Sequence, residues 1–230
     1  MDAIVELAEH IAATDYEDLP ADLIPVCKQF ILDTLGVAIA GSTASGCETV
    51  ADLVCQWGGK PQSHVFLHDM QAPAHHAVLA NTMMSRARDF CDTHDEVGLH
   101  INTSVLPTAL AAAEMRGGVS GRELLSAVAL GGDVMCRMAL AVPADRPLHF
   151  SVATLYGAFG STAAAGKVLG LDAEQLVHAF GIVLSQTAGN IQCIMDGALS
   201  LRMQQAFAAQ AGMLSVCLAQ GGITGAKRVL

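Results

Sequence analysis

Acidic and imidazole side chains are concentrated between Arg88 and His100. Six of them fall within twelve residues, although charged residues make up only 15% of the chain: Asp89, Asp92, His94, Asp95, Glu96 and His100. If a preceding helix continues this far, Asp89 and Thr93 lie one turn apart. Gly98 then frees the chain to bring His100 back toward them.

Three interpretations of this segment compete. It could be a solvated acidic loop. It could be a divalent metal site, because carboxylates and imidazoles are suitable ligands, but the spacing matches no compact ligand motif. It could also perform acid–base catalysis, because a histidine gives or takes a proton near neutral pH and a nearby carboxylate fixes its tautomer.

Two other patterns favour structural roles. The run from Gly160 to Lys167 resembles a phosphate-binding loop, but five residues separate its glycines where four are needed, and Val168 stands where a hydroxyl should hold magnesium. We reject that function. Asp133 and Arg137 are spaced for an ion pair within one helix, and we prefer this to a catalytic role.

Helical periodicity dominates the chain. After Pro20, apolar residues from Leu23 to Ile39 recur at helical spacing and form one stripe, which ends at Gly41 and Ser42. A capping box at Ser120–Glu123 predicts a second helix. A third should begin at Asp172 and bury Leu176, Phe180, Val183 and Leu184, and a fourth runs from about Leu199 to Gln220, with Met203, Phe207, Leu214 and Leu218 on one side.

Small residues between Gly157 and Gly170 predict a helix that its neighbours approach closely. One short strand is expected at Ser63–Leu67, and sustained period-two alternation is absent. We find no repeat and no linker. The sequence therefore predicts a single, predominantly all-α domain over residues 1–230.

Composition excludes several classes of function. A net charge of −10 and 4% aromatic residues argue against nucleic-acid binding. Hydrophobic residues reach 52%, but the stretch 147–166 lacks the dense Leu, Ile, Val and Phe content that a spanning helix needs, and the run 124–142 contains Asp133 and Arg137. We see no signal peptide, and seven scattered cysteines fit reduced thiols. We expect a soluble cytoplasmic protein whose apolar excess forms core and subunit interface.

Four motifs, in order along the chain, resemble the MmgE/PrpD family. Leu19-Pro20 with the run Phe30–Gly41 is similar to the family's opening helix. Asp89-Phe-Cys-Asp-Thr-His, His100 and Val105–Glu114 resemble its signature. Tyr156–Gly160 with Ala163–Leu171 resembles its small-residue helix, and Gly197–Gln205 with Gly221–Gly225 its late helix.

The resemblance implies a multi-helix domain, a separate α+β lid domain and an active site between them. Family chains are about twice as long as this one, so the lid domain is expected to be absent here. The chain is either a fragment or a shortened member. Family members act on small di- and tricarboxylates without a metal or organic cofactor.

Residue by residue, Asp89, Thr93 and His100 match the family's catalytic positions, and His149 matches a second proton-transfer position. The alternative role of His149 is that of a structural histidine. Arg202 and Asp92 are candidate substrate-binding residues. Leu201 stands where many members carry lysine, and Arg202 cannot readily replace that lysine as a proton donor because it stays protonated.

The implied function is that of a metal-independent lyase or epimerase acting on a small polycarboxylate, similar to 2-methylcitrate dehydratase. The chemistry is proton abstraction next to a carboxylate with elimination, decarboxylation or epimerisation. The alternative is a truncated, non-catalytic helical dimerisation domain. In either case we expect a homodimer, no membrane segment and no nucleic-acid partner.

Overall fold

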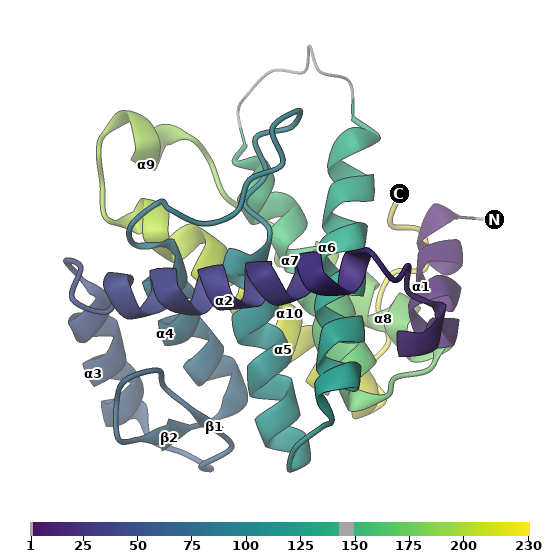
Figure 1. The fold of residues 1–230 in the computed structure, drawn as a ribbon, viewed down its shortest axis with the longest axis horizontal. Coiled ribbons are helices and arrows are strands. Elements are labelled where there is room, and N and C mark those ends of the chain that lie inside the picture. The colour runs from purple at the N-terminus through teal and green to yellow at the C-terminus, as the bar shows by residue number, and fades with distance from the viewer. Residues whose placement is uncertain (1, 143–149) are drawn as a thin grey trace.

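The computed structural model describes residues 2–142 and 150–230, and these are predominantly helical, as predicted (Figure 1). The helices are α1 (Ala3–Ala13), α2 (Leu23–Gly41), α3 (Cys47–Trp57), α4 (Ala74–Arg86), α5 (Asn102–Arg116), α6 (Gly121–Leu140), α7 (Val152–Leu169), α8 (Ala173–Leu184), α9 (Gln192–Met195) and α10 (Ser200–Gln220), with a short 3₁₀ turn at Tyr16–Asp18.

The helix starts follow from capping chemistry. Ser120 and Glu123 form the predicted capping box of α6, and Asp172 and Gln175 form that of α8. The strand expected at Ser63–Leu67 is shorter: β1 (Ser63–His64) pairs antiparallel with β2 (Gln71–Ala72). Glu114 of α5 accepts hydrogen bonds from the Ser63 hydroxyl and the His64 amide, which ties this hairpin to the helices.

α7 lies at the centre of the larger hydrophobic core and packs against α5, α6, α8 and α10. The predicted close approach is confirmed. A Cβ added at Gly160 would stand 2.8 Å from the Gly131 carbonyl oxygen of α6, and one at Gly212 of α10 would stand 2.7 Å from Cβ of Ser161. Small residues therefore set the helix spacing.

The close approach also decides which face of α10 is buried. The side expected to carry Met203, Phe207, Leu214 and Leu218 is not the core side, because Phe207 is exposed and the other three are only partly buried. The buried face consists mostly of small residues such as Ala208, Ala209 and Gly212. On α8, Leu176, Phe180 and Val183 are buried as expected, but Leu184 is exposed.

α2 crosses the front of α4 and α5 in Figure 1. Gly41 lets it approach α4, since an added Cβ would clash with the Met84 carbonyl oxygen. Much of its apolar stripe is not in the core: Val26, Phe30, Leu32 and Ile39 are exposed. By length and hydropathy α2 could cross a membrane, and 22% of that window is buried. The described residues leave this apolar face uncovered.

Candidate functional site

The segment from Ala87 to Ile101 connects α4 to α5 and turns back on itself. α4 ends at Arg86 and does not continue to Thr93. Asp89 and Thr93 therefore do not lie one helical turn apart. Instead, Asp89 adopts a left-handed conformation with φ 58°, which is uncommon for a non-glycine residue. His94 and Leu99 then pair as an antiparallel bridge around Gly98, whose φ is 60°. This turn returns His100 to Asp89, as predicted from the position of Gly98.

Arg86, Asp89 and His100 form a charged cluster. The Arg86 guanidinium donates a hydrogen bond from Nη1 to Oδ1 of Asp89, and the same oxygen lies 3.7 Å from Nε2 of His100. The residue Arg86 is only 9% exposed, whereas the Asp89 side chain is mostly accessible. A buried cation, an accessible carboxylate and an imidazole therefore meet at one point.

The other ring nitrogen of His100 faces the inside of the loop. Nδ1 lies 3.3 Å from Oγ1 of Thr93 and 3.3 Å from Sγ of Cys91. The His100 carbonyl accepts a hydrogen bond of 3.1 Å from Nε2 of Gln205, a buried residue of α10. The backbone and one edge of the ring are thus fixed by neighbours.

Burial lowers the pKa of His100 below its usual value, and the adjacent Arg86 lowers this pKa further, while Asp89 opposes the shift. The neutral imidazole is therefore favoured in the free protein. A bound anion next to the ring would act in the same direction as Asp89 and stabilise the protonated form.

Asp92 serves the backbone. Its carboxylate accepts hydrogen bonds from the Asn102 amide at 3.1 and 3.3 Å and from Nδ2 of Asn102 at 3.1 Å, at the first turn of α5. Burial raises its pKa to about 6 despite these bonds. The structure thus gives Asp92 a helix-capping contact, and it does not line the cavity described next.

A cavity of about 310 Å³ opens beside His100. The described residues that line it come from the end of α4, the loop before α5, the start of α7, and the segment from Ile191 to Gln205. They include Arg86, His100 and Gln205 on the polar side and Leu201, Ile194 and Met195 on the apolar side. The α4–α5 loop and α9 lie at the same end of the molecule in Figure 1.

The predicted site residues are brought together only in part. Asp89, Thr93 and His100 meet, whereas Arg202 donates a hydrogen bond of 2.7 Å to the Ser45 carbonyl and does not line the cavity. His149 lies outside the described residues. Sequence reasoning missed Arg86, although its position three residues before Asp89 was a usable signal.

Potential metal ligands also meet here. One atom each from Asp89, Cys91 and His100 lies within 4.8 Å of the others. However, the carboxylate of Asp89 already pairs with the buried Arg86 guanidinium. A cation placed between these groups would be repelled by Arg86 at short range. The Arg86 guanidinium therefore disfavours a metal ion at this point.

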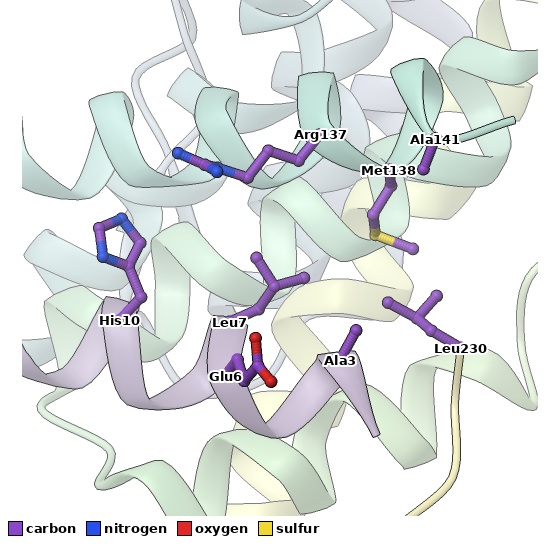
Figure 2. Close-up of a pocket in the computed structure, with 8 residues that line it drawn as sticks. All are labelled: Ala3, Glu6, Leu7, His10, Arg137, Met138, Ala141 and Leu230. Atoms are coloured by element: carbon purple, nitrogen blue, oxygen red, sulfur yellow. The ribbon is translucent and has the colours of Figure 1, made fainter. Parts of the chain in front are cut away.

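A second cavity, of about 340 Å³, lies between α1, α6 and Leu230, far from the acidic loop in sequence (Figure 2). Its polar members are Glu6, His10 and Arg137. The Arg137 side chain donates to Asp133 over 2.6 Å, so the predicted intrahelical ion pair is confirmed. The described lining of this cavity contains none of the predicted site residues.

Comparison with known proteins gives the family. Residues 5–230 match the MmgE/PrpD N-terminal domain. The chain is 29% identical to a cis-aconitate decarboxylase of Aspergillus terreus over 224 residues, which is 95% of this chain and 45% of that protein. It is 32% identical to the human cis-aconitate decarboxylase over 209 residues, 88% of this chain and 43% of that protein.

A cis-aconitate decarboxylase-like protein of Aspergillus oryzae is 27% identical over 232 residues, covering 97% of this chain and 48% of that protein. The chain thus spans about half the length of the curated relatives it matches. The domain match covers nearly every residue described above, including the whole acidic loop and the helices that line the cavity beside His100, α4, α7, α9 and α10. The chain belongs to the MmgE/PrpD family.

Proposed function

We propose that this chain carries the proton-transfer site of a lyase that acts on a small tricarboxylate, by the decarboxylation that its relatives' names state. The observation that supports this most is that Arg86 and His100 line one cavity, with the Asp89 carboxylate beside both of them. The cluster offers a buried cation for a carboxylate and an imidazole beside it. These are the groups that proton transfer next to a carboxylate requires.

The proposed reaction needs one bond cleavage and one protonation. The carbon–carbon bond to a substrate carboxylate breaks, and carbon dioxide leaves. The electron pair stays on the substrate, delocalised into the remaining conjugated carboxylate. The His100 imidazolium then gives its proton to a substrate carbon that bears this delocalised electron pair. The substrate has then lost CO₂ and gained H⁺.

Each neighbour of His100 has a role in this step. Arg86 holds a substrate carboxylate through its planar guanidinium. Asp89 stabilises the imidazolium before the proton leaves. Thr93 and Cys91 fix the ring through Nδ1, so Nε2 is the nitrogen that transfers the proton. His149 stays a candidate for a second proton-transfer group, on the strength of the family resemblance.

Arg202 and Asp92 have weaker claims to contact the substrate. Neither residue lines the cavity, whereas Arg86 does, and both have backbone partners, Ser45 and Asn102 respectively. We therefore assign the anion-binding role to Arg86. The two residues keep a supporting role, Asp92 in fixing the loop against α5 and Arg202 in fixing the start of α10 against the segment before α3.

The test is turnover by the purified 230-residue chain. Cis-aconitate, 2-methylcitrate and iminodisuccinate are incubated with it, with and without chelator, and products are followed by NMR. We expect chelator-insensitive turnover of cis-aconitate, and His100→Gln should lower kcat/KM by about 10² or more. His10→Gln, which removes an exposed histidine of α1, is the matched control.

Two results would contradict the proposal. A loss smaller than threefold in His100→Gln would remove the proton-transfer role from that residue. No turnover of any of the three compounds would favour the alternative, a non-catalytic helical domain.

A further inference from the structure

The cavity of about 340 Å³ between α1 and α6, here called the α1–α6 cavity, has no part in the proposed function. The residues that α1 contributes are spaced by three, four and seven positions, so they form one face of that helix: Ala3, Glu6, Leu7 and His10. The rest of the described lining is Arg137, Met138 and Ala141 of α6, with Leu230. Two helix faces therefore make most of this cavity.

The polar and apolar side chains are separated along the cavity, as Figure 2 shows. The Arg137 guanidinium extends along α6 toward His10 and away from Met138. Met138, Ala141 and Leu230 lie at the other end. Met138 is only 5% exposed and belongs to the larger hydrophobic core, so packing fixes its position. The cavity therefore has a polar end and an apolar end.

The charges at the polar end are matched within the protein. Arg137 donates a hydrogen bond of 2.6 Å to Oδ2 of Asp133, and Nε2 of His10 lies 3.7 Å from the same oxygen. Glu6 differs from them, because its exposed carboxylate has no ion pair and no hydrogen bond in the part of the chain that the structure describes. The described lining thus carries one unmatched charge, which is negative.

An unmatched carboxylate beside apolar side chains favours a ligand of particular chemistry. Glu6 would repel an anion, and so would the net charge of −10 on the whole chain. Ala141 is exposed and Leu230 is 57% exposed, so an apolar group that covers them removes apolar surface from water. A cation with an apolar tail gains from both features.

We infer that the α1–α6 cavity binds a small alkylammonium ion, whose charged group lies at Glu6 and whose tail lies along Met138 and Leu230. This ligand site goes beyond the proposed function, because its described lining shares no residue with that of the cavity beside His100. The ligand is a free amine and not the lysine side chain of a partner protein. The apolar end requires a tail that ends in carbon, whereas the stem of a lysine leads to a polar peptide group.

The experiment compares compounds that share a six-carbon tail and differ in charge: hexylammonium, hexanol and hexanoate. Binding to the purified chain is followed by NMR, through the methyl resonances of Met138 and Leu230. Exposed ion pairs contribute little, so at low salt hexylammonium should bind about threefold more tightly than hexanol and at least about fivefold more tightly than hexanoate. High salt should reduce both ratios, because it screens exposed charges.

The contribution of the tail is measured with butylammonium. Two methylenes that are half covered contribute about as much as one that is fully buried, so butylammonium should bind about fourfold more weakly than hexylammonium. Equal affinities of the two amines would overturn the inference, since the apolar end would then have no role in binding.

Three variants connect the preference to the cavity. Glu6→Gln should bring the affinities of hexylammonium and hexanoate within about twofold of each other and leave that of hexanol unchanged. Glu9→Gln, the matched control, removes an exposed carboxylate of α1 that is not among the described lining residues, and it should keep the wild-type ratios. Ala141→Leu fills the apolar end from an exposed position, which folding should tolerate, and it should weaken all three six-carbon compounds.

Four other results would overturn the inference. They are equal affinities of hexylammonium and hexanol at low salt, equal effects of Glu6→Gln and Glu9→Gln, the absence of any shift in the two methyl resonances, and an affinity for Nα-acetyl-lysine amide that matches the affinity for hexylammonium. The last result would assign the cavity to a lysine of a partner protein. Turnover of cis-aconitate enters none of these measurements, so a failure of the proposed function leaves them unaffected.

Discussion

The sulfur of Cys91 lies 3.3 Å from Nδ1 of His100, on the side of the ring that faces into the loop. Thr93 approaches the same nitrogen. Because Nδ1 is engaged by these two groups, Nε2 is the nitrogen that faces Asp89. The loop therefore decides which ring nitrogen is available for proton transfer, and the contacts of Nδ1 can be removed one at a time.

Thr93→Val removes the hydroxyl without changing the volume of the side chain much. A hydrogen bond of this kind contributes about 0.5–1.5 kcal/mol, so kcat/KM for cis-aconitate should fall about 2- to 12-fold. Thr93→Ser keeps the hydroxyl and should restore most of the activity. If Ser and Val behave alike in steady-state kinetics, the hydroxyl has no role in holding the ring.

The pKa of His100 should respond in opposite directions to its two charged neighbours. In the wild type it lies below the usual value of 6.5, and Asp89 is the neighbour that raises it. Asp89→Asn should therefore lower the pKa further, while Arg86→Gln should raise it. Ring chemical shifts of His100, followed by NMR across pH, measure this without any assay. A rise in Asp89→Asn would contradict the arrangement of charges proposed here.

Local sequence signals predicted much of the fold because they act over a few residues. The capping boxes at Ser120 and Asp172 and the left-handed turn at Gly98 depend on neighbours three or four positions away. The apolar faces of α2 and α10 were harder to predict. Periodicity identifies a stripe of large residues, but α7 comes so close to α10 that its small-residue face is the buried one.

At the site, too, contacts within one loop could be predicted from the sequence, and contacts between distant segments could not. The family motif correctly grouped Asp89, Thr93 and His100, which lie in one loop. It could not show that Gln205, more than a hundred residues later, fixes the His100 carbonyl. Nor could it show that Leu201 and not Arg202 lines the cavity. Consecutive helical residues point about 100° apart, so a shift of one position changes which side chain reaches the ligand.

The pH dependence of stability should carry a contribution from Asp92. Its pKa is raised from 3.8 to about 6 in the folded protein, so the folded state holds the proton more tightly than the unfolded state. This contribution favours folding most below about pH 4 and declines as pH rises toward about 6, by an amount on the order of 1–3 kcal/mol. Urea unfolding at several pH values measures it.

Asp92→Asn removes the titrating group and should flatten this part of the profile. The substitution should be tolerated, because Oδ1 of Asn102 is buried without a partner among residues 2–142 and 150–230, and a rotated Asn102 amide can accept from the new Nδ2. Asp95→Asn, which removes an exposed carboxyl from the same loop, is the control. An unchanged slope in Asp92→Asn would show that other groups govern stability in this range.

Gly160 and Gly36 make a matched pair for the role of close helix packing. Gly160→Ala forces a Cβ to within 2.8 Å of the Gly131 carbonyl oxygen, and overpacking of this kind costs about 1–3 kcal/mol. Gly36→Ala lies in α2 with open space around the added carbon and should stabilise by about 0.5–1 kcal/mol. Denaturant midpoints should therefore move in opposite directions. A stabilised Gly160→Ala would mean that α6 and α7 are free to separate.

The exposed face of α2 leads to a last prediction, that the chain associates with a second copy. Leu32 is 73% exposed and Phe90 is 80% exposed, and the two side chains line one shallow surface hollow with Val37. Apolar surface of this extent usually marks a contact with another protein or with a membrane. Light scattering without detergent should give a dimer or larger assembly, and Leu32→Glu with Phe90→Glu should shift it toward monomer. Glu48→Gln, on the neighbouring helix α3, changes one charge outside this face and should leave the assembly intact. A wild-type chain that is strictly monomeric in this measurement, or one that stays dispersed only in detergent or lipid, would contradict self-association through α2.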